Sequence, residues 1–391
     1  MPTISAGSKA SLTPSPAGVP EPTVPGSSGN WIWPSWRNLI LFALLSRVVV
    51  FAVGFMVVGG GSDNSRRWEA FRRFDAIWYE QIAVGGYDEY RPARENRIAF
   101  LPALPIAMAS GGVLGVSPKV MGVLAPNLAF VVGLACFGRA ALRVTGQSGT
   151  AWRACLLLTA YPYSFFFSAP YQESLGLALM AAGLVLWVED RPWAAILVLP
   201  WAPLARLQGV SLPAAIGIDW VVARLRGRAS RRWACLVALS GGLGLLLFGL
   251  YCYQKYGDPL IHLKAHGMWG RKPASLPNFA RSLVAPAVRW WEGSRLDLKN
   301  YAIAVLFLGL AAHAWWRRGL FWAILIAVPI LEGMVNDTLM GMGRIALMAF
   351  AGFIDLAEIL NLRITFWGGM AVMVLVQVYL IWQYSHWIFV A

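Results

Sequence analysis

Long apolar runs joined by short polar connections constrain the fold of this chain more than any other feature. The first run, Leu39–Gly61, is long enough to cross a hydrocarbon core at about 1.5 Å of rise per helical residue. Composition agrees, because 58% of the residues are hydrophobic and 13% are charged, whereas soluble domains have roughly 25% charged residues. The sequence therefore predicts an all-α polytopic membrane protein. Later apolar runs cover residues 98–115, 119–142, 151–168, 174–188, 192–205, 209–223, 233–253, 300–316, 319–335, 343–361 and 365–385.

Basic residues are distributed along the whole chain. The formal net charge is +14, and the lysines and arginines lie between apolar runs instead of on one soluble face. This distribution favours membrane lipids and phosphate-bearing lipids as partners, and it argues against nucleic acid. The four cysteines lie within or at the ends of apolar runs without Cys-x-x-Cys spacing, which predicts neither a disulfide framework nor a zinc site.

The chain divides into two regions of different composition. Residues 1–30 are rich in Ser, Pro, Gly and Thr, and such a segment cannot bury enough apolar surface to offset its chain entropy. We predict a disordered tail over residues 1–35 and one integral membrane domain over 36–391. The tail lacks the basic-then-apolar pattern of a cleaved signal, so Leu39–Gly61 is expected to be a retained membrane helix.

Short arginine-rich connections predict the orientation of the bundle. Residues 139–153, 224–232 and 317–318 carry arginines in short connections, as cytoplasmic loops do. If the amino terminus is also cytoplasmic, an odd number of crossings must separate the first run from Arg139. Two apolar runs occupy that interval, so one of them should not span the membrane.

The run at 98–115 is the expected exception. Pro102 and Pro105 break it, as do two glycines, and this pattern suits a helix that lies at the interface. The prediction is then a bundle of about 11 transmembrane helices. Its outer loops are residues 62–97, which carry interfacial helices, and residues 254–299. Shorter outer connections are expected at 169–173, 206–208 and 336–342.

The loop directly after the first membrane run is polar and rich in aromatic residues. Its carboxylate, Asp75, would lie close to the bilayer surface beside Trp78 and Tyr79. There it can meet a substrate whose tail remains in the lipid. The alternative is an ordinary ion pair of Asp75 with the neighbouring Arg72 or Arg73.

Two further charged residues lie at predicted membrane boundaries. Glu173 precedes an apolar run, where partial desolvation would reserve it for a partner. Its alternative role is that of a helix N-terminal acid that interacts with the helix dipole. Arg206 lies between two closely spaced apolar runs and must pair or reach water, so snorkelling to a lipid headgroup is its alternative.

The longest outer loop contains Asp258, His262, His266 and Arg271. The two histidines are four residues apart, which is metal-ligand spacing on a helix. Neither a third ligand nor a Glu-x-x-His arrangement accompanies them in the sequence, so we favour contact with a substrate phosphate or a headgroup over a metal. Arg344 adds a cation at another predicted outer boundary.

Five motifs occur in order over residues 36–362. They are Phe74–Tyr87, Phe100–Pro105, Phe166–Ser174, Arg206–Gly209, and Gly257–Pro259 with Trp269–Arg271. These motifs resemble those of the PIG-V-type mannosyltransferases, relatives of GPI mannosyltransferase II in the GT-C glycosyltransferase superfamily. The third motif, Phe-Phe-Ser-Ala-Pro-Tyr-Gln-Glu-Ser, is a nearly complete match. This chain departs from the family at Phe74, where Trp is usual, at Leu207-Gln208 and around Arg344.

The resemblance implies a GT-C-like bundle and a transferase that takes a sugar, expected to be mannose, from a polyprenyl-phosphate carrier on the non-cytoplasmic face. The sequence has no Asp-x-Asp motif and no glycine-rich nucleotide loop, so we expect no metal and no other cofactor. Aromatic rings suit sugar faces, and cations suit a phosphate leaving group.

Our mechanistic hypothesis is an inverting single displacement in which Asp75 is the general base on an acceptor hydroxyl. Glu173 would position the acceptor or share that role. Arg206, with Arg344 or Arg271, would neutralise the departing phosphate. The other substrate-binding candidates are Trp78, Tyr79, Tyr171, Gln208, Asp258, His262 and His266.

Two other functional classes are also compatible with the sequence. A lipid-linked sugar flippase or transporter also needs a basic cavity that opens to lipid, but it needs no base beside an acceptor. A structural membrane subunit is the third class. Abundant Arg, Ala, Gly and Trp indicate a GC-rich bacterium, so the expected location is a bacterial cell membrane and the expected acceptor is a glycolipid, polysaccharide or protein.

Overall fold

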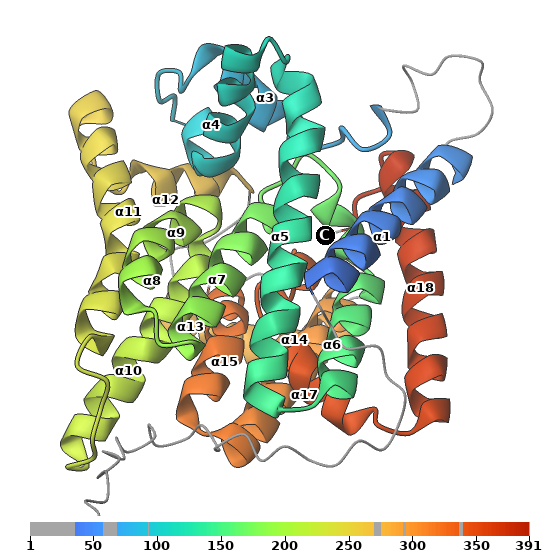
Figure 1. Ribbon diagram of the computed structural model, residues 1–391. Helices are drawn as coiled ribbons and strands as arrows, with labels where there is room; N and C mark the ends of the chain where they lie inside the picture. The colour runs from blue at the N-terminus through green and yellow to red at the C-terminus, as the bar shows by residue number, and fades with distance from the viewer. Residues whose placement is uncertain are drawn as a thin grey trace, which may run out of the picture.

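The protein is an all-α bundle in the computed structural model (Figure 1). The structure describes residues 36–57, 69–92, 94–269, 275–291, 295–335 and 339–390, and these ranges contain no β-strand. The predicted tail at 1–35, Arg271 and part of the predicted connection at 336–342 lie outside the described residues. The predicted all-α fold is confirmed.

The α-helices are α1 (Trp36–Val57), α3 (Ala76–Gly85), α4 (Ala103–Ser110), α5 (Pro118–Thr145), α6 (Ser148–Ala160), α7 (Glu173–Val188), α8 (Pro192–Val198), α9 (Ala202–Ala205), α10 (Ser211–Leu225), α11 (Ala234–Tyr256), α12 (Ile261–Ala265), α13 (Leu276–Trp291), α14 (Arg295–Arg318), α15 (Leu320–Met334), α16 (Met342–Ile345), α17 (Gly352–Ile359) and α18 (Arg363–Ser385). The 3-10 helices are η1 (Arg97–Ala99), η2 (Gly111–Leu114), η3 (Ser164–Phe167), η4 (Leu199–Trp201), η5 (Leu207–Val210) and η6 (His266–Trp269).

Five of the described helices are long and apolar enough to cross a membrane, namely α1, α5, α11, α14 and α18. The central one is α5, since 44% of its membrane window is buried against other helices, compared with 22% in α1 and in α18. The outer helices expose large apolar side chains such as Leu45, Leu246 and Leu375. These faces suit lipid tails, and the chain is an integral membrane protein.

Several predicted runs form short helices instead of full spans. The run at 192–205 breaks into α8, η4 and α9, because Pro200 and Pro203 lack the N–H that a continuous helix needs. The run at 343–361 contains α16 and α17 joined by turns. Its backbone forms short-range bonds there, such as Met348 N–H to the Ile345 carbonyl at 2.8 Å, and protein covers it on all sides.

The run at 98–115 is broken, as its prolines and glycines predicted. It forms η1, the eight-residue α4 and η2, and it ends at Gly115 with φ of 68°. Helices α3 and α4 lie together over one end of the bundle, at the top of Figure 1, with α12 beneath them. The predicted first outer loop therefore carries short helices at one end of the molecule.

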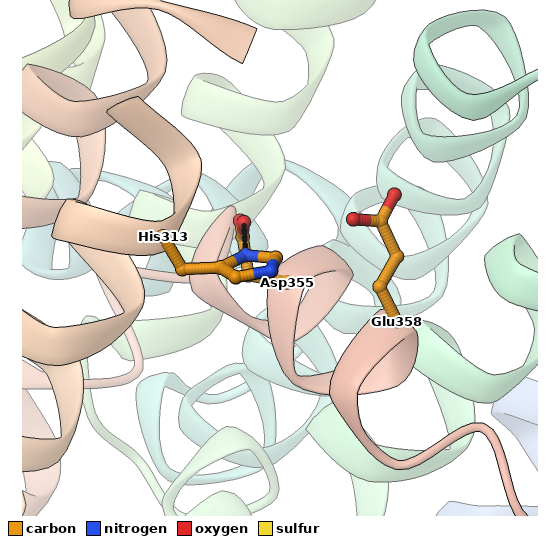
Figure 2. Close-up of side chains that lie close together, drawn as sticks. All are labelled: His313, Asp355 and Glu358. Carbon is orange, nitrogen blue, oxygen red and sulfur yellow. Dashed lines mark hydrogen bonds and ion pairs between the residues drawn. The ribbon is translucent and has the colours of Figure 1, made fainter. Parts of the chain in front are cut away.

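The arginine-rich connections lie at the opposite end of the bundle, at the bottom of Figure 1, between α5 and α6, α10 and α11, and α14 and α15. Here Glu189, after α7, accepts hydrogen bonds from Arg139 at 2.9 Å and Arg143 at 3.0 Å. Burial opposes ionisation of Glu189, but these two arginines hold the pKa of its carboxyl below the ordinary value. A second polar cluster at this end contains His313, Asp355 and Glu358 (Figure 2).

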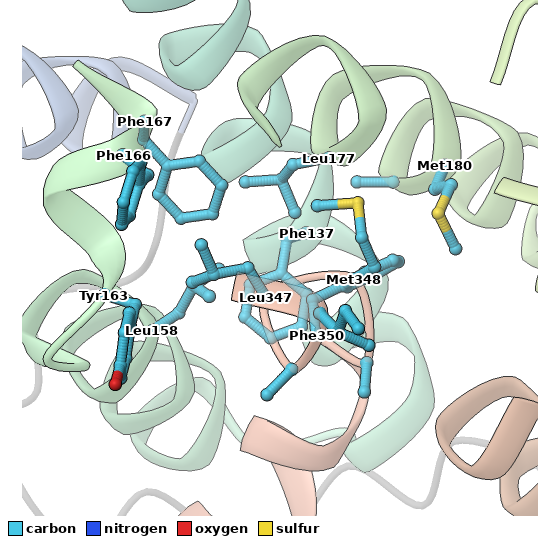
Figure 3. Packing of buried hydrophobic residues seen from close by; sticks show 14 of the residues in the cluster. Phe137, Leu158, Tyr163, Phe166, Phe167, Leu177, Met180, Leu347, Met348 and Phe350 are labelled. Carbon is cyan, nitrogen blue, oxygen red and sulfur yellow. The ribbon is translucent and has the colours of Figure 1, made fainter. Parts of the chain in front are cut away.

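A dense core joins α5, α6, α7 and the segment that follows α16 (Figure 3). Phe137, Leu177 and Phe350 are fully buried within it. Glycine allows a close contact between two helices here, because a Cβ on Gly133 of α5 would lie 3.0 Å from the backbone nitrogen of Ala178 in α7. This packing fixes α7 against the central helix α5. It also fixes the position of Glu173, the first residue of α7.

Candidate active site

A cavity of about 640 Å³ lies at the end of the bundle covered by α3 and α12. This volume is in the range of pockets that hold small ligands. Its lining comes from the start of α3, the segment around η1, α12, η5, α15 and α16. Its polar lining residues include Asp75, Tyr79, Gln172, Arg206, Gln208, His262, His266, Glu332 and Arg344.

Four charged side chains from four separate segments form one network beside this cavity. Arg344 contacts Asp75 Oδ2 through Nη1 at 3.1 Å and Glu173 Oε1 through Nε at 2.7 Å. Arg206 Nη1 contacts the same Glu173 oxygen at 2.5 Å. The exposed fraction is 0% for the Glu173 side chain, 13% for Arg206, 15% for Arg344 and 29% for Asp75. The two acids and two bases balance in charge, as burial requires, and Asp75 is the most accessible member.

Tyr171 fixes the backbone that presents Asp75. Its hydroxyl donates to the Arg73 carbonyl at 2.9 Å and accepts from the Asp75 N–H at 3.1 Å. Burial raises the pKa of Tyr171 well above its ordinary value, so the hydroxyl keeps its proton. The Arg344 guanidinium lies over the Tyr171 ring at 4.5 Å and over the Phe166 ring at 4.7 Å, which adds cation–π stabilisation.

Glu173 and Arg206 are both presented at helix ends. Glu173 is the first residue of α7, and Arg206 lies in an extended conformation between α9 and η5. The turn after Arg206 requires glycine, because a Cβ on Gly209 would come within 2.4 Å of the Ala202 carbonyl. The Gly209 N–H in turn donates to the Arg206 carbonyl at 2.7 Å. The Arg-Leu-Gln-Gly sequence therefore builds a tight turn that aims its arginine at Glu173.

The network continues through Gln208 to a residue that the sequence reasoning missed. Gln208 accepts from Arg206 Nε at 3.1 Å and donates from its own side chain to Glu332 of α15. Glu332 also lines the cavity. The available signal was a single acid inside the apolar run 319–335, since an ionisable residue at membrane depth usually has a specific partner.

These contacts decide between the roles left open by the sequence. Asp75 does not pair with its neighbours, because Arg72 binds Glu80 and the Arg73 guanidinium lies over the Trp387 ring at 4.7 Å. Glu173 is a helix N-terminal acid, and it also binds two arginines. Arg206 is mostly buried and paired, so the snorkelling interpretation of this residue is wrong.

The remaining predicted residues lie at different depths around the cavity. His262 is buried and its Nδ1 lies 2.9 Å from the Ile98 carbonyl, while His266 lines the cavity with its ring 4.9 Å from that of His262. Asp258 lies off the cavity wall, where it binds Lys264 at 2.5 Å. Trp78 stacks on Phe100, with ring centroids 5.9 Å apart, and does not line the cavity.

The side chains best placed for a metal among the described residues are at the other end of the bundle. Ligand atoms of His313, Asp355 and Glu358 lie within 4.8 Å of one another (Figure 2). However, Arg318 contacts Asp355 Oδ2 at 2.6 Å and Glu358 Oε2 at 2.9 Å. The guanidinium already binds both carboxylates, so a cation would have to displace it.

Comparison with known proteins gives a likeness at the level of the fold. No protein-family model matches the sequence, and no curated protein sequence matches it. Among solved structures, the crystal structure of ArnT from Cupriavidus metallidurans bound to undecaprenyl phosphate matches with a TM-score of 0.51 and 18% sequence identity. The match covers 85% of this chain and 62% of ArnT, so this chain spans less than two thirds of that protein. The likeness confirms the predicted GT-C-like fold.

Proposed function

We propose that this protein is a membrane glycosyltransferase that moves a sugar from a polyprenyl-phosphate donor to an acceptor hydroxyl. The observation that carries this proposal is the accessible carboxylate of Asp75, held by a buried arginine on the wall of a cavity at the end of a membrane bundle. Support for the donor class comes from ArnT, a protein of similar fold that binds undecaprenyl phosphate. Mannose is the expected sugar, because the five motifs resemble those of PIG-V-type mannosyltransferases.

An apolar groove of about 430 Å³ offers a place for the donor's isoprenoid chain. It lies between α3 and α4 on one side and α9 and α11 on the other, and its lining includes Ile106, Leu247 and Phe248. The ring of Phe248 also contacts the ring of His262 at 5.7 Å, so the groove lies beside the polar cavity. A lipid in the groove would place its phosphate in the cavity, as a polyprenyl-phosphate sugar requires.

Asp75 would act as the general base. As the acceptor oxygen attacks the anomeric carbon, Asp75 takes the hydroxyl proton, and the bond from that carbon to the phosphate oxygen breaks with its electron pair going to the phosphate. Attack opposite the leaving group inverts the anomeric configuration. Arg344 would orient the Asp75 carboxylate, and Glu173 would hold Arg344 in place.

The departing phosphate needs cationic donors. A guanidinium has five N–H donors, and in Arg206 two of them serve Gln208 and Glu173, so the group has capacity for phosphate oxygens. His266 and Lys264 on the α12 wall add further donors. Arg271 belongs to the same predicted set but lies outside the described residues. Such preorganised donors stabilise the charge that develops in the transition state.

We also propose that the cavity opens on the non-cytoplasmic face of a bacterial cell membrane. The arginine-rich connections, which favour the cytoplasmic side, lie at the other end of the bundle from α3 and α4. The domain boundaries at 1–35 and 36–391 belong to this proposal as well. Acceptor candidates on that face are glycolipids, polysaccharides and proteins.

The direct test is transfer by purified protein. The protein would be incubated with radiolabelled polyprenyl-phosphate mannose and membrane extract, and the labelled product would be identified. Transfer by wild type but not by Asp75→Asn is the expected result. If neither protein forms product while both move the labelled lipid across vesicle membranes, the chain is a flippase and the proposed reaction is wrong.

A further inference from the structure

Residue 74, directly before the proposed base, has a strained backbone. Phe74 has φ of 51°, and it is one of three residues other than glycine with positive φ in the described chain. This region is unfavourable for a bulky side chain, and it persists only where surrounding contacts hold it. Strain next to Asp75 therefore points to a device that fixes this part of the loop.

The end of α18 and the segment that follows it supply those contacts. The Phe74 ring packs against Tyr384, Trp387 and Phe389, with centroid distances of 5.6, 5.3 and 5.8 Å. The Arg73 guanidinium lies 4.7 Å from the centroid of the same Trp387 ring. We call Tyr384, Trp387 and Phe389 the aromatic clamp. Together these rings pack against the side chains of Arg73 and Phe74, which directly precede Asp75.

Hydrogen bonds also hold the backbone of residues 71–73. The buried Tyr384 hydroxyl lies 3.1 Å from the Phe71 carbonyl, 3.2 Å from the Arg73 carbonyl and 3.3 Å from the Arg73 N–H. Tyr171 binds the Arg73 carbonyl from the other side. The chain from 71 to 75 is thus held by two tyrosines that come from distant parts of the sequence.

We infer that the aromatic clamp is a positioning device for Asp75, which sets the direction of its carboxylate toward Arg344 and the cavity. This inference rests on the proposed function of Asp75. Without the clamp, residue 74 is free to relax to negative φ, and the turn that starts α3 would rotate the carboxylate away from Arg344. General-base catalysis depends on hydrogen-bond geometry, so turnover would fall while donor binding changes little.

The test uses Trp387→Ala combined with Phe389→Ala, and Trp367→Ala as a matched control. Trp367 is a half-exposed tryptophan near the start of α18, at the other end of that helix from Tyr384. Hydrogen–deuterium exchange of peptides covering 71–79 reports the loop without any assay of transfer. Steady-state kinetics then separate kcat from the donor KM.

In the clamp variant we expect faster exchange over 71–79, unchanged exchange over 352–359, and a kcat at least about tenfold lower with the donor KM within about twofold. The control should match wild type in each measurement. Unchanged exchange over 71–79, or faster exchange with unchanged kcat, would overturn the inference. Absence of transfer in wild type would defeat the proposed function, while the exchange result would still decide whether the clamp holds the loop.

A double-mutant cycle keeps the inference testable if the clamp variant is unstable. Phe74→Gly removes the ring that the clamp grips and makes positive φ inexpensive. In that background, Trp387→Ala should lower kcat by less than it does in wild type, because the Phe74 contact is already absent and only the Arg73 contact is left to lose. Equal effects of Trp387→Ala in both backgrounds would show that Trp387 acts elsewhere.

Discussion

Two charge clusters in the described part of the chain use the same types of side chain in different ways. At the end covered by α3, Arg344 joins Asp75 and Glu173, which come from different segments. At the opposite end, Arg318 joins Asp355 and Glu358, which lie one turn apart on α17. His313 adds a hydrogen bond to Asp355 at 2.7 Å (Figure 2).

Accessibility separates the two clusters. The Asp75 side chain is 29% exposed and lines the cavity, whereas the Asp355 side chain is 1% exposed and lines neither the cavity nor the apolar groove. A closed cluster of this kind ties α14 to α17. An arginine that binds two acids therefore does not indicate a functional site by itself. An acid in such a cluster that remains accessible from a cavity is the better indication of one.

The first prediction concerns the sides of the membrane on which the two ends lie. In a chain without its native cysteines, Ser110→Cys and Gln147→Cys introduce exposed thiols before and after α5, whose 28 residues span about 40 Å. A thiol reagent confined to the cytoplasm should label Gln147→Cys and leave Ser110→Cys unlabelled. The reverse pattern would put the cavity on the cytoplasmic side and contradict the proposed face.

Replacement of the accessible acid should have the largest effect on turnover. Asp75→Asn keeps the size of the side chain and removes the base, so we expect transfer to fall at least about a hundredfold, with a loss of unfolding free energy of about 1 kcal/mol because the part-exposed pair with Arg344 is lost. The measurement is initial rate on protein that elutes as a single species in detergent. More than about a tenth of wild-type turnover would defeat the assignment of Asp75 as the base.

The matched substitution in the closed cluster should affect stability instead. Asp355→Asn weakens the charged hydrogen bonds that this buried side chain makes with Arg318 and His313, which should lower the free energy of unfolding by about 2 kcal/mol. Thermal unfolding in detergent would show this as an earlier transition, while kcat of the folded fraction stays within about twofold of wild type. A hundredfold loss of kcat in Asp355→Asn, at normal stability, would remove the distinction between the clusters.

Substitution of Arg206 tests whether the charge network also binds the phosphate of the donor. Arg206→Ala should raise the donor KM about tenfold or more, because charge-assisted hydrogen bonds to phosphate would be lost. Arg206→Lys keeps the charge but not the planar fork, so a smaller defect is expected. Unchanged donor kinetics in folded Arg206→Ala would move the phosphate role to Arg344, Arg271 or the α12 wall.

The smallest effect on stability is expected for a substitution of Glu189, which binds a half-exposed pair of arginines. Since the pKa of Glu189 is depressed in the folded protein, its contribution is present above the ordinary carboxyl pKa of 4.5 and is lost as pH falls through the folded value. Glu189→Gln should therefore lower the unfolding free energy by about 0.5–1 kcal/mol at neutral pH. In stronger acid the two proteins should unfold alike, and a constant difference across pH would contradict the ionic origin.

Composition, long apolar runs and the family resemblance predicted the fold class, and prolines and glycines predicted the broken run at 98–115. They did not predict where long apolar runs divide into short helices, because protein on all sides allows turns such as those at 346–351, which a lipid-exposed segment would not tolerate. For the candidate site, the sequence singled out Asp75, Glu173, Arg206 and Arg344 one by one. Their pairing depends on tertiary contacts, so the sequence assigned the arginines to phosphate without showing that each already binds an acid.

Glu332 and the aromatic clamp escaped the sequence reasoning for different reasons. Glu332 lay inside a run treated as uniformly apolar, although a lone acid there was a usable signal. The clamp had no such signal. Aromatic residues near the end of a membrane helix commonly lie at the lipid interface. Only the packing of Phe74 against Trp387 shows that these rings contact the loop before Asp75 instead.

The separation between Asp75 and Arg344 along the chain, 269 residues, has a consequence for biosynthesis. At about 5–20 residues per second, the ribosome adds the arginine on the order of 10–50 s after the acid. During that interval the nascent chain carries a carboxylate at the membrane without its final partner. The cavity beside Asp75 is therefore completed among the last events of insertion. A ribosome that stalls before α16 would leave in the membrane a chain that has most of its helices and no assembled charge network.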